Sequence, residues 1–555
     1  MAVLCLHAPE RRSTICEPAQ TVGRQSYARL AIAAVLLGTL LFCINHAGVI
    51  AAEISAPAGY RSVHILRNFD QPQYITWMTL ARNHFLLPDY HAPWQTAPAL
   101  FQPMMMVAAR LGPSPIISYY ALQFLLYWVA AFAFLLAAFS FRLTPAQVFL
   151  AALIVICAVP LKLLAWVGAP LIGLPRDMFV EGLIQYSYET ADGLFRGGSS
   201  NGPTLTFGTA IILFAFTFLA RYLETFDRRE FCKFLASVFL AGLLHPFEVF
   251  LIAAVGGVLL LQQRQLRYFL LVVAAAGCGI APYVVLTLKT PWLRDISGLI
   301  HWSMPSRLWV PGVYGVPVIL LIYLMLLRFR MKPPGDRVLQ AWFLGCLILP
   351  FVPVLPFALH LFNGFACCVA FLLVRRVASD RQLLAVLATY RKTAQGMLAV
   401  WVTVSVLATG AVYVQVFRDG RSVEPALLIS AIASADETRV LDWVGAHVPS
   451  NALVLSPQAL SPLVATAPAH SFASHDFSSI TYQEQSKLAD RFYAGEDLTS
   501  YLIGRFGLRY VIVGCESPAA RRLERWPLRL DLKTLKIYEV SSDALKPYDQ
   551  ARLRK

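Results

Sequence analysis

Long apolar runs alternate with short polar or basic clusters along roughly the first 420 residues. Most of the runs have the length with which an α-helix crosses a bilayer, about 17 to 25 residues. The pattern therefore predicts a mostly α, polytopic membrane protein with about 11 transmembrane crossings, some of them short or broken. The expected segments are 30–52, 116–140, one from 148 onward, 203–220, two half-crossings within 234–261, 268–288, 312–327, 338–354, 356–374 and 393–417.

The run 234–261 is predicted to turn back on itself. Basic clusters flank it on both sides, and a single crossing would place the second cluster outside the membrane, against the positive-inside bias. The run is too short for two full helices. We therefore expect a short hairpin that turns at His245-Pro246-Phe247-Glu248, with His245 and Glu248 facing a polar cavity. The alternative is a simple helix break whose side chains are satisfied locally.

Polar residues also interrupt the run 356–374, where His360 and Asn363 stand among apolar neighbours. Polar groups at membrane depth are costly, so a functional role is the default hypothesis. A hydrogen bond between two helices is the plainer alternative for both residues. His360 is retained as a candidate substrate-binding residue.

Composition agrees with a membrane protein, because 57% of the residues are hydrophobic and only 14% are charged, against about 25% charged in soluble domains. The net charge of +15 lies in clusters between apolar runs, which is typical of cytoplasmic loops and not of a nucleic-acid patch. Residues 1–29 are read as an uncleaved cytoplasmic lead. The cysteines show no metal-ligand spacing, and no metal site is assigned.

These signals favour a bacterial inner (plasma) membrane, with an endoplasmic-reticulum membrane as the open alternative. An odd number of crossings from a cytoplasmic N-terminus places the C-terminal domain outside the cytoplasm. The transmembrane domain is expected over 30–417, with outer loops at 53–115, 174–202 and 289–311. Lys162 falls in the third crossing, either as an anchor at the outer interface or as a cation for a lipid phosphate.

The first outer loop carries the stretch on which the functional argument depends. Asp70 precedes Gln73, Trp77 and Met78 in a pattern typical of a capped helix start. A carboxylate on a short helix at a membrane surface is also where an enzyme that uses lipid substrates would keep a catalytic base. The two interpretations of Asp70, helix cap and base, are compatible.

The composition changes from about residue 424, and the segment 424–555 predicts a small α/β domain with its own core. Helices are expected at 433–448, 481–493 and 498–506, and strands at 452–456, 509–514 and 535–540. The tail contains no Gly-rich phosphate loop and no GxSxG motif.

Together these features resemble the GT-C superfamily of integral-membrane glycosyltransferases, which use polyprenyl-phosphate-linked sugars. The resemblance rests on the multi-pass pattern, on Asp70-x-x-x-Tyr74 in the first outer loop, and on tail motifs such as Tyr510-Val511-Ile512-Val513-Gly514. Many members carry adjacent Asp-Glu in the first loop, whereas Asp70 is followed here by Gln71. A member would have its α/β domain on the extracytoplasmic side.

The resemblance implies that an acceptor attacks the anomeric carbon of the sugar while the lipid phosphate leaves. Asp70 is then the base, with Glu189 and Asp192 as substitutes or as oxygen ligands for a possible divalent cation. Cations would stabilise the leaving phosphate. The candidate substrate-binding residues are Arg67, Tyr74, Lys162, Arg196, His245, Glu248, Lys289, Arg294, Arg307 and His360.

Two other functions fit the same pattern. Interrupted helices also mark transport sites, so a multi-pass transporter or lipid flippase is one alternative. A non-catalytic cell-envelope scaffold is the other, and in that case Asp70 would only cap its helix. The expected partners are the lipid bilayer, a polyprenyl-phosphate-linked sugar and an unknown acceptor, with no nucleic acid and no certain cofactor.

Overall fold

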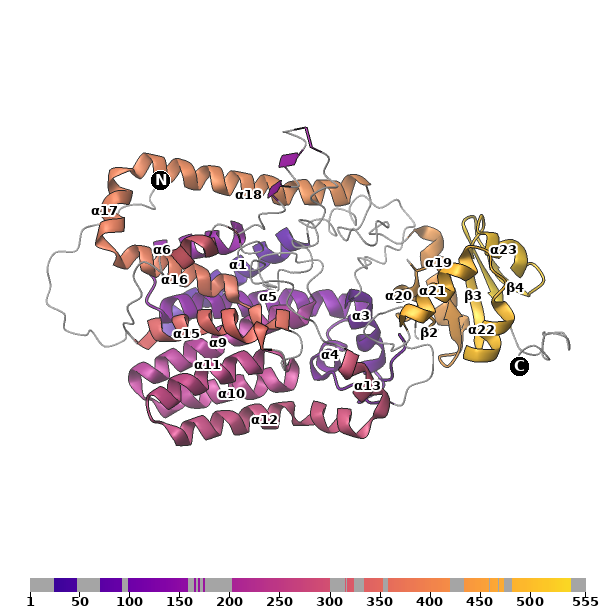
Figure 1. Cartoon of the computed structure of the whole chain (residues 1–555), viewed down its shortest axis with the longest axis horizontal. Helices are drawn as coiled ribbons and strands as arrows, with labels where there is room; N and C mark the ends of the chain where they lie inside the picture. The colour runs from indigo at the N-terminus through magenta and orange to yellow at the C-terminus, as the bar shows by residue number, and fades with distance from the viewer. Residues whose placement is uncertain are drawn as a thin grey trace.

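The computed structural model describes most of the chain with gaps. The described residues are 24–46, 70–91, 98–157, 202–299, 317–323, 334–352, 358–419, 434–473 without 459 and 468, and 482–540, with isolated positions at 164, 165, 168, 169, 173, 174 and 315. In these residues a bundle of long helices is followed, at one end, by a small α/β domain near the C-terminus (Figure 1).

Five helices are long and apolar enough to cross a membrane, within the described part of the chain. They comprise α1 (Arg24–Asn45), α5 (Pro115–Ser140), α9 (Pro203–Thr225), α12 (Leu266–Lys289), and α16 (Phe365–Ser379) extended back to His360. Each coincides with a segment predicted from the apolar runs. The protein is therefore a mostly helical, polytopic membrane protein, and the total of about 11 crossings stays a prediction.

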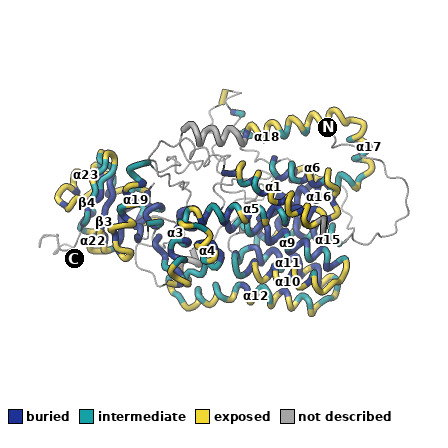
Figure 2. The backbone as a smooth tube through the Cα atoms, turned by 180° about the vertical axis from the view of Figure 1, so that it is seen from behind, coloured by how far each residue is buried: buried dark blue, intermediate teal, exposed yellow. Residues whose placement is uncertain are grey.

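The core of the bundle surrounds α9. This helix packs against α5 on one side and against α10 (Arg228–Leu244) and α15 (Pro334–Ile348) on others. Phe216 of α9 and Trp342 of α15 are fully buried with ring centroids 4.9 Å apart. Apolar side chains on α12 are instead exposed, as expected for a surface in contact with lipid. Figure 2 shows the buried positions gathered in α5, α9 and α11.

The run that was predicted to turn back does so. Helix α10 ends at Leu244, and α11 (Glu248–Gln262) begins after a three-residue break. The two helices hold 17 and 15 residues, so each is shorter than the roughly 20 residues of a full crossing. Together they form the short hairpin expected from the basic clusters on both sides.

The run 356–374 is also broken. A 3-10 helix, η5 (Ala358–Phe362), leads into α16 through Gly364, whose φ of 72° lies in the left-handed region that glycine tolerates. Another 3-10 turn, η4 (Leu349–Phe351), follows α15. The other helices of this part are α6 (Pro145–Cys157), α17 (Arg381–Thr389) and α18 (Arg391–Asp419).

The outer loops predicted at 53–115 and 289–311 contain short helices. Helix α3 (Asp70–Ala81) and helix α4 (Pro103–Ala108) lie before α5, and Leu87 pairs with Leu100 in an isolated antiparallel bridge between them. Helix α13 (Pro291–Leu299) follows α12. The second outer loop, predicted at 174–202, lies outside the described residues except for positions 174 and 202.

The C-terminal domain is built on a five-stranded sheet with the order β2-β1-β3-β5-β4. Strands β1 (Leu453–Leu455), β2 (His470–Ser471) and β3 (Leu508–Gly514) are parallel, whereas β4 (Leu528–Asp531) and β5 (Leu535–Glu539) pair antiparallel. Its helices are α19 (Ala435–His447), α20 (Ser461–Val464), α21 (Tyr482–Tyr493), α22 (Thr499–Phe506) and α23 (Pro518–Leu523). All six predicted elements are present, while β2, β4, α20 and α23 were not predicted.

The domain packs against α3 and the residues that follow it. One apolar cluster joins Met78 of α3 with Val444 of α19 and Leu463 of α20, all of them fully buried. The backbone N–H of Ser471 donates a hydrogen bond of 3.0 Å to the carbonyl oxygen of Tyr90. Helix α3 therefore lies at the junction of the helix bundle and the domain.

Candidate functional site

Helix α3 is attached to the N-terminal end of α9 through Tyr74. The Tyr74 hydroxyl and Thr204 Oγ1 share a hydrogen bond of 2.8 Å. A Cβ at Gly202, the residue before α9, would lie 1.9 Å from Tyr74 Cε2, so only glycine allows this approach. The ring of Tyr74 also stacks on Tyr119 of α5 at 6.4 Å between centroids. Tyr74 is thus one of the side chains that hold α3 against the bundle.

Asp70 is the first residue of α3, one helical turn before Tyr74. Residues four apart lie on the same face of a helix, so the backbone places Asp70 on the side that Tyr74 turns toward α9. The side chain of Asp70 lies outside the described part of the chain, and its assignment as cap or base stays a prediction. The neighbouring Gln71 is buried and donates a hydrogen bond of 3.1 Å to the Tyr120 hydroxyl.

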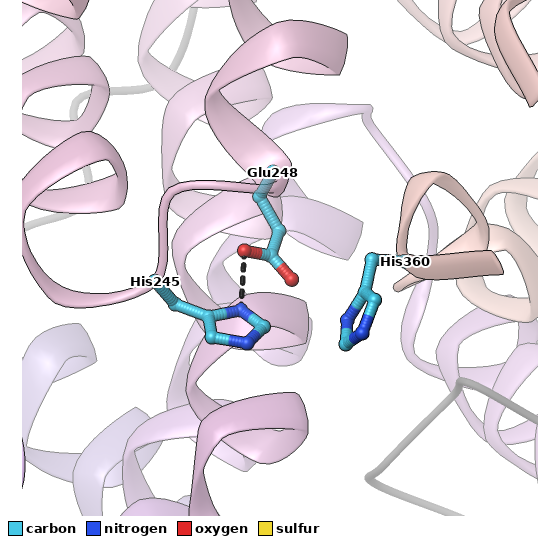
Figure 3. Close-up of side chains that lie close together, drawn as sticks. All are labelled: His245, Glu248 and His360. Carbon is cyan, nitrogen blue, oxygen red and sulfur yellow. Dashed lines mark hydrogen bonds and ion pairs between the residues drawn. The ribbon is translucent and has the colours of Figure 1, made fainter. Parts of the chain in front are cut away.

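A buried polar cluster lies at the break between α10 and α11. His245 Nδ1 is 2.6 Å from Glu248 Oε2, and the rings of His245 and His360 are 5.2 Å apart between centroids. Glu248 is fully buried and His245 nearly so, whereas His360 is partly exposed. Figure 3 shows the Glu248 carboxylate directed toward both imidazole rings. We call these three residues together with Asn363 the Glu248 cluster.

Asn363 and Gly208 complete the surroundings of the carboxylate. Asn363 Nδ2 donates a short hydrogen bond to Glu248 Oε1, so both carboxylate oxygens have partners within the protein. A Cβ at Gly208 of α9 would lie 2.3 Å from Glu248 Oε1. The glycine therefore makes room for the carboxylate against the backbone of α9. One partner of the carboxylate, His245, is local to the hairpin turn, whereas Asn363 comes from the turn that precedes α16.

The local sequence explains why these groups converge. His245 ends α10 in an extended conformation, with φ −156° and ψ 90°, and Pro246 cannot continue that helix. Glu248 then falls in the first turn of α11, where the helix dipole favours a negative charge. His360 and Asn363 come from η5 and the turn after it, which Gly364 redirects into α16.

The cluster combines one carboxylate and two imidazoles inside the helix bundle. A buried charge is stable only when it is paired or hydrogen-bonded, since its desolvation is costly. Such a set can bind a cation, a metal ion or a polar group of a ligand. Gly202, directly before α9, and Gly208 of α9 lie six residues apart, so the Tyr74 contact and the cluster are about 9 Å apart along the helix axis.

The remaining predicted residues fall into two groups. Lys289 ends α12 and Arg294 lies in α13, both with exposed side chains. Helix α12 lies near the segment before α4, because Tyr283 and Phe101 have ring centroids 5.7 Å apart. The others lie outside the described part of the chain; they are Arg67, Lys162, Glu189, Asp192, Arg196 and Arg307.

Sequence reasoning missed the residues of α9 that touch the site. Thr204, Gly202 and Gly208 look like ordinary members of an apolar helix and its glycine-rich approach. Thr206, also on α9, donates a hydrogen bond of 3.4 Å to Gln123 of α5. One sequence signal could have identified these residues. Small or hydroxylated residues recur along this apolar run, and such residues are typical of close contacts between membrane helices.

Comparison with known proteins gives structural neighbours only. No protein-family model matches the chain, and no curated protein matches it. The chain is similar to the crystal structure of ArnT from Cupriavidus metallidurans in the apo state, with 11% sequence identity, a TM-score of 0.49 and coverage of 94% of this chain and 99% of that chain. It is also similar to ArnT from the same organism bound to undecaprenyl phosphate, with 12% identity, a TM-score of 0.43 and coverage of 94% and 100%.

Proposed function

We propose that the protein is a membrane glycosyltransferase that moves a sugar from a polyprenyl-phosphate donor to a lipid, glycan or protein acceptor on the extracytoplasmic face. The observation that carries this proposal is the position of α3. This helix begins with Asp70, is bonded to α9 through Tyr74, and packs against the C-terminal domain through Met78.

The position of α3 suits a reaction between a lipid and a second substrate. A donor with a polyprenyl tail must reach the site from the membrane helices, whereas the acceptor can approach from the side of the C-terminal domain. A carboxylate at the start of α3 would stand where these two routes meet. Helix α13, which contains Arg294, follows α12, and Tyr283 of α12 contacts Phe101 just before α4.

The chemistry assigns a role to each group. The acceptor oxygen or nitrogen forms a bond to the anomeric carbon, while the bond from that carbon to the phosphate oxygen breaks with its electron pair. Asp70 takes the proton of the acceptor, as a general base. Lys289 and Arg294 stabilise the negative charge of the leaving polyprenyl phosphate. No metal ion is needed to balance this step.

The test is transfer of a labelled sugar by the full-length protein in lipid, with undecaprenyl-phosphate sugars as donors. Asp70→Asn should lower the rate of transfer by about 10²-fold or more, the usual contribution of a general base. Binding of the donor should survive, because a base acts after binding; it is read as an increase in the melting temperature, Tm. Asp442→Asn, at an exposed position of α19, is the matched control. Normal transfer by Asp70→Asn would remove Asp70 from the mechanism.

One observation favours transport as a second candidate function. Glu248 is fully buried within the helix bundle, and buried carboxylates among membrane helices are typical of proton and ion pathways. The two functions differ in what happens to a labelled donor. Label in a new covalent product supports the transferase, whereas intact label that crosses the bilayer supports the transporter. A scaffold would give neither result.

A further inference from the structure

We propose that His245, Glu248 and His360 bind a divalent transition-metal ion of the zinc class. This inference goes beyond the proposed function and does not depend on it, because it concerns the hairpin turn and not α3. It also differs from the sequence-based predictions, because the cysteine spacing indicated no metal and the three residues were considered as contacts for a substrate or as hydrogen-bonded groups within the bundle.

The distances are close to those of a metal centre. One ligand atom from each of the three residues lies within 4.8 Å of the other two. Around a tetrahedral zinc ion with bonds of 2.0–2.1 Å, ligand atoms are about 3.3 Å apart. The three side chains point toward one place (Figure 3), so binding an ion requires their ligand atoms to move closer together by up to about 1.5 Å.

The types of ligand select the class of metal. Two imidazoles with one carboxylate are a common ligand set for zinc and also for iron(II), with further coordination positions left for water or another ligand. Magnesium and calcium prefer sites built from oxygen atoms alone. A zinc-class ion therefore fits this set better than the ions that most often accompany phosphate chemistry.

The surroundings of the three residues resemble the outer shell of a metal site. Asn363 donates to Glu248 Oε1 and so orients the carboxylate. The ring of Phe247 stacks on that of His360, with 4.6 Å between centroids and 27° between planes. Partners of this kind hold ligands in position, and their loss typically weakens metal binding by about 10 to 100-fold.

The ligands come from separate parts of the chain. His245 and Glu248 flank the break between α10 and α11, whereas His360 belongs to η5, which precedes α16. A bound ion would therefore fasten the hairpin to the broken helix that follows α15. Both breaks in the helices lie next to the proposed ligands. Irregular backbone inside a membrane protein is tolerated where protein or a cavity surrounds it, and here it positions the three side chains.

The competing explanation is a hydrogen-bonded cluster without metal, and metal analysis separates the two. The full-length protein is purified in detergent, stripped with a chelator and dialysed against ZnCl₂, and bound zinc is measured by mass spectrometry. We expect about one zinc ion per chain, as for a single three-residue site, and an increase in Tm on zinc addition. Glu248→Gln and His360→Ala should each lose this zinc, whereas His447→Ala, which removes an exposed histidine of α19, should keep it.

Replacement of zinc by cobalt provides a readout that does not depend on the variants. Bound Co²⁺ should show visible absorption of nitrogen and oxygen coordination in the wild-type protein. Absence of bound metal in the wild type, or absorption from cysteine coordination alone, would overturn the proposal even if the variants fail to fold. Retention of stoichiometric zinc by a folded Glu248→Gln or His360→Ala protein would do the same. None of these readouts uses sugar transfer, so failure here leaves the proposed function standing.

Discussion

The helix bundle and the C-terminal domain treat the same residue type in opposite ways. Glu248 in the bundle has 0% of its side chain exposed and is held by His245 and Asn363. Glu496 in the domain has 44% of its side chain exposed and pairs with Arg491. Glu496 of the domain thus stays in contact with water, whereas Glu248 of the bundle is out of contact with solvent.

The difference shows where the molecule accepts an energetic cost. An exposed ion pair contributes little to stability, with a median of about 0 to 1 kcal/mol. A buried carboxylate is costly to desolvate, and an apolar residue of similar size in its place is often neutral or stabilising. The packing of the bundle therefore gives no reason for Glu248, and this is why we propose a functional role for it. The comparison can be tested by changing one residue in each region.

The largest effect is expected from removing the buried carboxylate. Glu248→Ala leaves the polar groups of His245 and Asn363 without their partner and should destabilise the bundle by about 3–5 kcal/mol, as for other broken buried pairs. Thermal unfolding of the detergent-solubilised protein measures this change. Glu496→Ala in the domain is the matched variant and should leave Tm unchanged. Equal effects of the two substitutions would break the comparison.

A smaller effect is expected from filling the space beside the carboxylate. In Gly208→Ala the new Cβ would lie 2.3 Å from Glu248 Oε1, and that oxygen cannot move away without losing its bond to Asn363. Crowding of this kind typically costs about 1–3 kcal/mol. We expect a lower Tm and, if the metal proposal is correct, weaker zinc binding.

Gly445→Ala is the control for this substitution, because Gly445 is also inside a helix but is exposed. The nearest atom to its new Cβ would be Ala467 Cβ at 3.9 Å, an ordinary contact. Alanine should therefore stabilise α19 by about 0.5–1 kcal/mol through its better helix propensity. A Gly208→Ala protein that is as stable as Gly445→Ala would show that the carboxylate is not held as tightly as its contacts indicate.

Prediction from sequence worked best where a long periodic pattern decides the structure. The five long apolar helices and the hairpin turn at His245 were predicted, since length, charge flanks and Pro246 leave few alternatives. In the domain, β3 was predicted from the apolar run Tyr510-Val511-Ile512-Val513, and β5 from the segment Leu535-Lys536-Ile537-Tyr538-Glu539-Val540. Strand β2 was missed because it holds only two residues, and β4 because its four residues are largely exposed and form no apolar run.

The candidate site was predicted only in part, and the reason is its long-range geometry. His245, Glu248 and His360 were each chosen as polar residues in apolar surroundings, but no local pattern shows that η5 would bring His360 to the hairpin. The roles of Gly202 and Gly208 depend on side chains from α3 and α11, far away in sequence. His245 and Glu248 were therefore predicted together at the hairpin turn, whereas only the fold shows that His360 joins them.

The smallest effect is expected for a carboxylate on the surface of the C-terminal domain. Asp436 accepts hydrogen bonds of 2.6 Å and 2.8 Å from the hydroxyl and the backbone N–H of Thr534, and these bonds lower its pKa below the ordinary value of 3.8. A lowered pKa stabilises the folded state above the unfolded value, and the stabilisation is lost as the pH falls through the folded pKa. Because solvent screens this partly exposed group, we expect a contribution of about 0.5 kcal/mol or less.

Asp436→Asn should therefore lower Tm slightly at neutral pH, and the gap to the wild type should stay constant down to about pH 5. Below pH 3.8 the gap should narrow, because the wild-type carboxylate then becomes protonated as well. Asp490→Asn, at an exposed position of α21, controls for loss of charge alone. A large difference in Tm between the two proteins, or one that does not change between pH 5 and pH 3, would contradict this prediction. Asp436 would then contribute to stability as a buried carboxylate does, and the contrast between the domain and the bundle would not hold.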